Sequence, residues 1–287
     1  MIGRQDLEQE INGVSTIKSI TEIYQQISAI SIIQVKNSVA KTRAFLEGVA
    51  LVYGHAKQSY LKQAQTLISR KKDVGSLDFI RRNKKEVLIF VSSNQTLYGD
   101  LISKVFNKFI GDVKEKRVDS VVIGKVGRAM IDKENINSRV EFFDLADYKP
   151  EWTKIQDITD FINKYEKITI YYGEFLSILN QIPTKSNISG GNSLGNPVEV
   201  VKDYIFEPTA KQIMEFFETQ VIANLFHQKI YEAQLARFAS RLLIMNDATN
   251  NANQQLENLK DDFLKIKKFS KNKKQLSTFS SRVLWEA

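Results

Sequence analysis

The sequence contains no cysteine, and only 4 prolines and 2 histidines occur among its 287 residues. Without cysteine the chain forms neither disulfides nor thiolate metal sites, and it has no thiol nucleophile. Neither proline nor glycine occurs from Thr209 to Ala287. Because nothing in this segment interrupts a helix, we predict one C-terminal helix that is far longer than a compact domain needs.

Long apolar runs are also absent. No segment approaches the ~18 uninterrupted apolar residues of a membrane span, and the first ten residues, MIGRQDLEQE, lack the apolar core of a signal peptide. We therefore expect the protein in the cytoplasm, or on the cytoplasmic side of a membrane that it does not enter.

A heptad pattern runs through the C-terminal segment. Its positions alternate steps of three and four residues, which is the spacing that winds helices into a left-handed supercoil. The predicted seam consists of Leu235, Phe238, Leu242, Met245, Thr249, Ala252, Leu256, Leu259, Phe263 and Ile266. A seam of this kind requires a partner helix.

The partner helix is predicted at the other end of the chain. No proline occurs from Leu7 to about Leu67, and apolar residues recur there at helical spacing. They are Leu7, Ile11, Val14, Ile17, Ile20, Ile23, Ile27, Ile30, Ile32, Val35 and Val39. Because apolar faces must be buried, we predict that the terminal helices pair antiparallel within one chain. An ordinary helical bundle is the simpler alternative.

In the segment between the two helices, apolar residues no longer recur at helical spacing. Short β-branched or aromatic runs predict strands at Val87–Ser92, Val118–Ile123, Arg139–Leu145 and Lys167–Tyr172. Amphipathic helices are expected at Leu101–Ile110 and Trp152–Tyr165, and a glycine-rich loop at Asn187–Pro197.

The predicted fold class is therefore α/β with long helices. It combines an antiparallel two-helix coiled coil with a small Rossmann-like α/β domain that has a largely parallel sheet. The predicted domains are an N-terminal coiled-coil helix (1–70), an α/β domain (71–205) and a C-terminal coiled-coil helix (206–287).

Positive charge is concentrated near the C-terminus. The formal net charge is +8, and a lysine-rich tip is formed by Lys260, Lys265, Lys267, Lys268, Lys271, Lys273 and Lys274. A positive rod can bind nucleic acid, an anionic membrane or an acidic protein surface. Few aromatic residues are available here to stack on bases, which disfavours nucleic acid. A merely solvated helix face is the simpler reading.

No catalytic, cofactor or metal site is predicted. The turn after the first strand, Ser92–Asp100, lacks the glycine spacing of a dinucleotide fingerprint and the Gly and Lys of a phosphate loop. Gly124 and Gly127 follow the second strand and indicate a turn more than an anion site. His55 and His227 have no second metal ligand at helical spacing, and we expect them on the surface or in the seam.

Several motifs, taken in order, resemble one family. The segment ASRLLIMNDATNNANQQLENL at Ala239–Leu259 is similar to the C-terminal signature of gamma subunits of F-type ATP synthases. Further similarity lies in YIFEP at Tyr204–Pro208, VLIFVSSNQTLYGDL at Val87–Leu101, VVIGKVG at Val121–Gly127, and Ile20-Thr21. The resemblance covers nearly the whole chain.

The resemblance implies a rotor without catalytic residues. In that family the coiled coil turns inside a ring of three alpha and three beta subunits, and the α/β domain sits at the foot beside the epsilon subunit and the membrane c-ring. Rotation couples ATP chemistry at the beta subunits to ion translocation. The residues that the resemblance places against the hexamer are Ile20, Thr21, Arg241, Met245, Lys267, Lys268, Lys271 and Asn272.

Two alternatives remain open at this point. The family's Arg-Gln-x-x-Ile-Thr stretch falls on residues 267–272, where only the first basic position is kept in kind. Such departures are compatible with a specialised, mycoplasma-like ATPase motor that is not coupled to ion pumping. A static coiled-coil scaffold is the alternative from another class.

Overall fold

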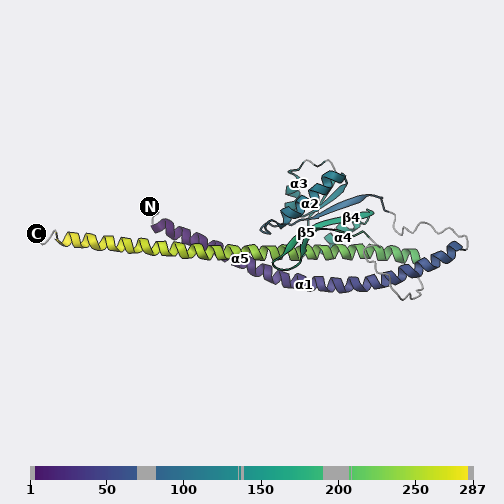
Figure 1. Cartoon of the computed structure of the whole chain (residues 1–287), viewed down its shortest axis with the longest axis horizontal. Coiled ribbons are helices and arrows are strands. Elements are labelled where there is room, and N and C mark those ends of the chain that lie inside the picture. The colour runs from purple at the N-terminus through teal and green to yellow at the C-terminus, as the bar shows by residue number, and fades with distance from the viewer. Residues whose placement is uncertain are drawn as a thin grey trace. The chain divides into compact units, whose positions relative to one another are not determined.

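The computed structural model describes residues 4–69, 82–134, 136, 139–189, 207 and 209–283. Its elements are α1 (Arg4–Ser69), β1 (Glu86–Val91), α2 (Leu101–Lys116), β2 (Asp119–Ile123), α3 (Lys125–Ile131), β3 (Val140–Phe143), α4 (Trp152–Ile162), β4 (Lys167–Phe175), β5 (Gln181–Asn187) and α5 (Ala210–Val283). The predicted fold class is confirmed: a long helix lies at each end of the chain and strands alternate with helices between them (Figure 1). The predicted loop at Asn187–Pro197 falls mostly outside the described residues.

Internal packing divides the chain into two compact units. We call residues 1–29 and 241–287 the paired-helix unit, and residues 30–240 the sheet unit. Each unit therefore contains part of α1 and part of α5. The predicted domain boundaries near residues 70 and 206 follow the ends of the long helices instead, and that division stays a prediction.

The sheet unit contains one five-stranded sheet in the order β3-β2-β1-β4-β5. β1 pairs with β2 and β4 in parallel, β2 pairs with β3 in parallel, and β5 pairs with β4 in antiparallel. This is the largely parallel sheet that the sequence predicts. β5 and the seven-residue α3 were not predicted.

Helices cover both faces of the sheet. On one face, Ile89 and Ile170 belong to a buried cluster with Ile158 of α4 and Phe226 of α5. On the other face, the ring of Phe90 lies 5.6 Å from that of Phe106 and 5.3 Å from that of Phe109, both on α2. Successive side chains of a strand point to opposite faces, so the nearly continuous apolar strands fill two cores at once.

Gly124 connects β2 to α3 in a conformation that only glycine adopts easily. Its φ is 103°, and a Cβ at this position would lie 2.7 Å from the carbonyl oxygen of Ser93. The backbone N–H of Val126 donates to the same oxygen at 2.9 Å. The absence of a side chain therefore lets the turn after β1 contact the start of α3.

We expect Gly124→Ala to lower the free energy of unfolding by about 2 kcal/mol or more, because alanine is strained at this φ and has no space for its Cβ. Gly111→Ala is the matched control. A Cβ at Gly111, in the middle of α2, would meet nothing within 4 Å, so this change is expected to stabilise the protein by about 0.5–1 kcal/mol. Urea unfolding of both variants measures the difference, and equal midpoints would contradict it.

The paired-helix unit is an antiparallel pair formed by the start of α1 and the end of α5 (Figure 1). The Thr249 hydroxyl donates to the Thr21 hydroxyl at 2.8 Å, and the Gln25 amide donates to Asn246 at 3.2 Å. The guanidinium of Arg4 lies 5.5 Å from the centre of the Phe263 ring. Residue numbers rise along one helix and fall along the other, as the sequence predicts.

The predicted packing face of α1 is partly wrong. Ile17, Ile20, Ile23, Ile27 and Ile30 are exposed, whereas Leu7, Thr21 and Ser28 are buried. The buried hydroxyls are satisfied within the helix, since Thr21 donates to the carbonyl of Lys18 and Ser28 to that of Tyr24, each at 2.7 Å. Satisfied hydroxyls cost little to bury, so small polar residues occupy the seam while isoleucines lie outside it.

Candidate functional site

The predicted seam of α5 is buried in its central part. In the paired-helix unit Met245, Thr249, Ala252 and Leu256 are buried. The remaining seam residues of this unit are half-buried, namely Leu242, Leu259, Phe263 and Ile266. Leu235 and Phe238 belong to the sheet unit and are buried there.

The residues predicted to contact a partner fall into two groups. Thr21, Arg241 and Met245 are buried within the chain. The guanidinium of Arg241 lies 5.4 Å from the centre of the Tyr24 ring in the same unit. The second group is exposed and consists of Ile20, Lys267, Lys268, Lys271 and Asn272. Only the exposed group has side chains available to another molecule.

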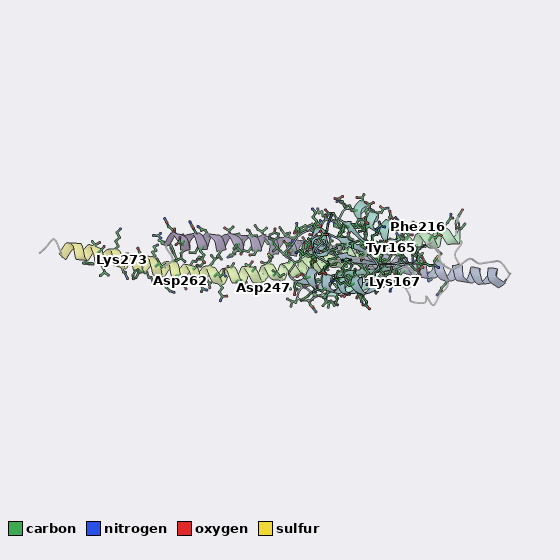
Figure 2. The ribbon with its side chains drawn as sticks, turned by 90° about the horizontal axis from the view of Figure 1, so that it is seen from above. Tyr165, Lys167, Phe216, Asp247, Asp262 and Lys273 are labelled. Carbon is green, nitrogen blue, oxygen red and sulfur yellow. The ribbon has the colours of Figure 1, made fainter. Side chains whose placement is uncertain are left out.

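The lysine-rich tip lies largely beyond the start of α1. In Figure 2, Asp247 and Asp262 lie where α1 runs beside α5, while Lys273 lies past the first turn of α1. Lys267, Lys268, Lys271, Lys273 and Lys274 are all exposed. Lys265 pairs with Asp262 at 2.9 Å. The tip therefore presents mostly unneutralised positive charge.

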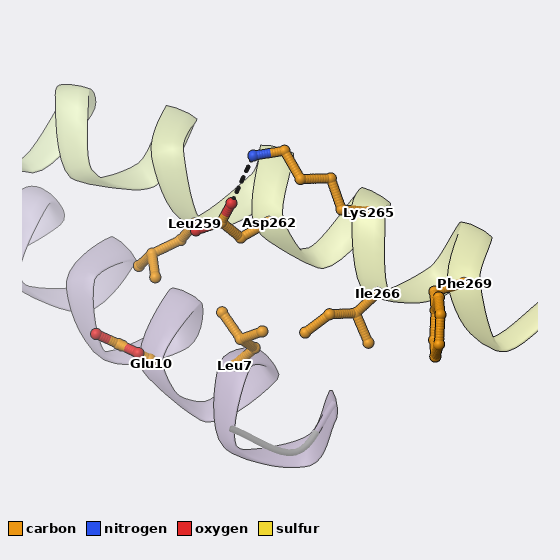
Figure 3. A pocket seen from close by; sticks show the side chains of 7 residues that line it. All are labelled: Leu7, Glu10, Leu259, Asp262, Lys265, Ile266 and Phe269. Carbon is orange, nitrogen blue, oxygen red and sulfur yellow. Dashed lines mark hydrogen bonds and ion pairs between the residues drawn. The ribbon is translucent and has the colours of Figure 1, made fainter. Parts of the chain in front are cut away.

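A groove of about 670 Å³ lies where α1 begins against α5. Figure 3 shows Leu7 of α1 facing Ile266 of α5, with Phe269 one turn further along. Lys265 and Asp262 lie on the rim, joined by their ion pair. The groove exposes the apolar seam at the point where α5 loses its partner helix, next to the positive tip.

A buried polar cluster in the sheet unit was not predicted. Asp147, in the loop after β3, accepts hydrogen bonds from the backbone N–H groups of Asn94 at 3.0 Å and Gln95 at 2.8 Å. Arg237 of α5 lies 3.8 Å from its carboxylate and donates to the carbonyl of Ser92. Gln234 of α5 donates to the carbonyl of Asp147 at 2.9 Å. The cluster thereby ties α5 to the loops after β1 and β3.

This cluster occupies the edge of the sheet where open α/β folds bind ligands. Such ligands lie outside the carboxyl ends of the strands, where the strand order changes direction, here between β1 and β4. Ser92 follows β1 directly and is buried, and Arg237 and Asp147, both buried, fill the space beside it.

The two histidines are buried, so neither lies on the surface, which is one of the two positions predicted for them. The ring of His227, on α5 in the sheet unit, lies 4.2 Å from that of Trp152 and 6.2 Å from that of Tyr231. Burial lowers the pKa of His227 from 6.5 to about 4. Among the residues that the structure describes, no group of three or more acidic or histidine side chains could hold a metal ion.

We expect acidification to destabilise the protein through His227. Its folded-state pKa of about 4 lies below the ordinary 6.5, so only the unfolded chain takes up this proton between these values. Stability is unaffected above pH 6.5 and falls as the pH drops toward 4. His227→Gln should lose less stability over this range, which urea unfolding at several pH values measures. Equal losses in both proteins would contradict the assignment.

Within the described part of the chain no helix is long and apolar enough to cross a membrane.

Comparisons with known proteins point to one family. The sequence model of the ATP synthase family matches residues 3–267. An ATP synthase gamma chain from Roseiflexus castenholzii is 26% identical over 266 residues, and the alignment covers 88% of this chain and 88% of the relative. A gamma chain from Chromobacterium violaceum is 24% identical over 271 residues, which cover 90% of this chain and 91% of the relative.

A solved structure shares the fold. The central stalk of the Tetrahymena thermophila mitochondrial ATP synthase, solved with its c-ring, aligns with a TM-score of 0.55 at 14% identity. The alignment covers 80% of this chain and 99% of the stalk chain. Because the family's sequence model matches most of the chain, this protein belongs to the ATP synthase family.

Proposed function

We propose that this chain is the central-stalk rotor, the gamma subunit, of an F-type ATP synthase or ATPase. It turns inside a hexamer of alpha and beta subunits and couples ATP synthesis or hydrolysis at the beta subunits to ion translocation. It carries no catalytic residue itself. Its foot partners are the epsilon subunit and the c-ring, and it lies in the peripheral part of the complex, on the cytoplasmic side of the bacterial membrane.

The proposal rests on one observation: the length of this chain and the order of its helices and strands both agree with those of the family that it matches. The gamma chains that it matches are aligned over about nine-tenths of their length. The antiparallel pair of the terminal segments and the parallel sheet between them occur in one chain. A static scaffold would need only the two long helices. A central stalk also needs an α/β domain between them in the sequence, and this chain has one.

The asymmetry of the paired-helix unit supports a mechanism by population shift. One end of α5 is a single positively charged helix, whereas its central part is paired with α1. As such a rod faces each beta subunit in turn, it makes different contacts with open and closed nucleotide sites. A difference in contact energy is sufficient to bias the conformation of each site, and the coupling is reciprocal.

For the partner-contact residues we propose two roles. The exposed residues Ile20, Lys267, Lys268, Lys271 and Asn272 contact the hexamer directly. The buried residues Thr21, Arg241 and Met245 act indirectly, because their packing sets how α1 and α5 lie against each other.

Native mass spectrometry of the complex purified through a tag on this chain tests the proposal. We expect three alpha and three beta subunits with one copy of this chain, together with epsilon and the c-ring. Recovery of the same hexamer with unfamiliar proteins and without a c-ring would instead indicate an ATPase motor that is not coupled to ion translocation. Recovery of the chain without any hexamer would refute the rotor.

Reversing the charge of the tip should impair function without unfolding the chain. For Lys267→Glu, Lys268→Glu and Lys271→Glu together we expect at least a tenfold lower ATPase rate of the assembled complex, because three attractive contacts become repulsive. The control reverses three exposed lysines elsewhere, Lys41, Lys133 and Lys149. Unchanged assembly and ATPase rate in the tip variant would show that the tip makes no such contact.

A further inference from the structure

A cavity lies in the sheet unit between α1, α5 and the loop after β3. Its volume is about 590 Å³, and the residues that line it include Ser31 and Ser38 of α1, Tyr148 of the loop, and Tyr231 and Gln234 of α5. Small-molecule sites typically have volumes of ~300–1,000 Å³, whereas one water molecule takes up only ~30 Å³ of the liquid. The cavity is therefore large enough for an organic ligand.

The wall of this cavity contains a buried acceptor that is not paired. Gln234 is 1% exposed, and its amide nitrogen donates to the carbonyl oxygen of Asp147 at 2.9 Å. Because a carbonyl oxygen only accepts, the amide nitrogen must face it, which leaves Oε1 of Gln234 as an acceptor. Among the residues that the structure describes, Oε1 has no hydrogen-bond partner. Since buried polar atoms are almost always paired, this acceptor indicates a donor that a molecule in the cavity supplies.

The cavity has aromatic walls and an uncharged interior. Tyr148 and Tyr231 are half-buried, and the ring of Tyr148 lies 5.2 Å from that of Phe238. Aromatic rings of this kind pack well against a flat ligand. Among the described residues that line the cavity, only Lys149 is charged, and it is exposed, so its ammonium group stays in water. A charged ligand would be buried without a counter-charge, which favours an uncharged one.

We propose that this cavity binds an uncharged, flat aromatic molecule whose N–H or O–H group donates to Oε1 of Gln234. The side chains of Ser31 and Ser38 provide further polar groups on the α1 side. Because the ligand contacts α1, α5 and the loop after β3 at once, its binding stabilises the packing of these three segments. The site belongs to the chain alone, so this inference does not depend on the proposed function.

Indole and benzofuran are the probes that test this site. The two molecules have nearly the same shape, but indole carries an N–H donor where benzofuran has a ring oxygen. Binding of each probe to the full-length chain is measured by NMR titration and by the shift of the melting temperature. For indole we expect saturable binding with a dissociation constant of about 1 mM or lower. Benzofuran should bind about fivefold more weakly or worse, because it offers no donor to Gln234.

Three variants locate the site. Ser38→Phe places a large side chain in the cavity and should weaken indole binding about tenfold or more. Its matched control is Ala40→Phe, which adds a large side chain at an exposed position of α1 outside the cavity and should leave binding within about twofold. Gln234→Met keeps the length of the side chain but removes the acceptor, so indole and benzofuran should then bind alike.

Preference for indole over benzofuran, lost in Gln234→Met, supports the inference when Ser38→Phe blocks binding and Ala40→Phe does not. If Gln234→Met fails to fold, the comparison of the two probes and of the two phenylalanine variants still decides. Absence of saturable indole binding, equal binding of both probes to the unaltered chain, or unchanged binding to Ser38→Phe would overturn the inference. None of these results bears on the rotor, which recovery of the hexamer tests separately.

Discussion

Asp147→Ala is expected to lower the free energy of unfolding by about 3–5 kcal/mol, the usual effect of removing one partner of a buried ion pair. Asp147 is 4% exposed, and its carboxylate accepts hydrogen bonds from the backbone of Asn94 and Gln95. Its loss leaves these N–H groups buried without their acceptor and the Arg237 guanidinium buried without its counter-charge. Thermal and urea unfolding measure the change.

Asp144 provides the matched control, because it lies three residues earlier on the same loop. Its side chain is exposed and pairs with Lys125 at 3.7 Å, so Asp144→Ala should cost no more than about 1 kcal/mol. Asp147→Asn should fall between the two, since an amide keeps one acceptor oxygen. Equal stability of the two alanine variants would show that the buried cluster does not hold α5 to the sheet.

Phe226→Ala is expected to destabilise the protein by a similar amount, about 3–5 kcal/mol, because it leaves a cavity in a fully packed core. Phe226 lies on α5 and is fully buried in the cluster that covers one face of the sheet. The measurement is the free energy of unfolding from urea titration. Hydrogen exchange should also show faster exchange in β1 and β4, which this cluster covers.

The control for this prediction is Phe216→Ala, on the same helix. Phe216 is 61% exposed, so its truncation should change stability by less than about 1 kcal/mol. If Phe226→Ala were as mild as the control, α5 would not be part of the core of the sheet unit.

Much of the fold was predictable because its elements carry strong local patterns. The strands at β1, β2 and β4 are apolar runs that parallel sheets require on both faces, and the absence of glycine and proline indicated α5. β5 was missed because Gln181–Asn187 is largely polar and contains Pro183. It forms as an edge strand through its antiparallel register with β4, a position in which proline is tolerated.

The two sides of α1 could not be assigned from sequence. Isoleucine recurs at helical spacing along the exposed side of α1, and the rule that apolar residues are buried favoured this wrong row. Buried Thr21 and Ser28 are compatible with the seam only because their hydroxyls bond to carbonyls of the preceding turn. Whether these hydroxyls form such hydrogen bonds depends on their side-chain rotamers, which cannot be predicted from the spacing of apolar residues.

The buried cluster around Asp147 had a weak signal that was overlooked. Asn94 follows β1 and Asp147 follows β3, and the carboxyl ends of parallel strands meet at the same edge of a sheet. Polar residues at both positions therefore indicated a contact. That Arg237 of α5 completes the cluster could not be predicted, because the heptad pattern assigns α5 only to a partner helix and not to the sheet.

Single-molecule observation can show whether this chain rotates inside the hexamer. Because the chain has no cysteine, Leu179→Cys on the β4–β5 turn, a residue 81% exposed, gives a single point for attaching a bead. With the hexamer fixed to a surface and ATP supplied, we predict continuous rotation of the bead in one direction, the same in every molecule. ATP hydrolysis by the assembled complex with a stationary bead would contradict the rotor and establish a static scaffold.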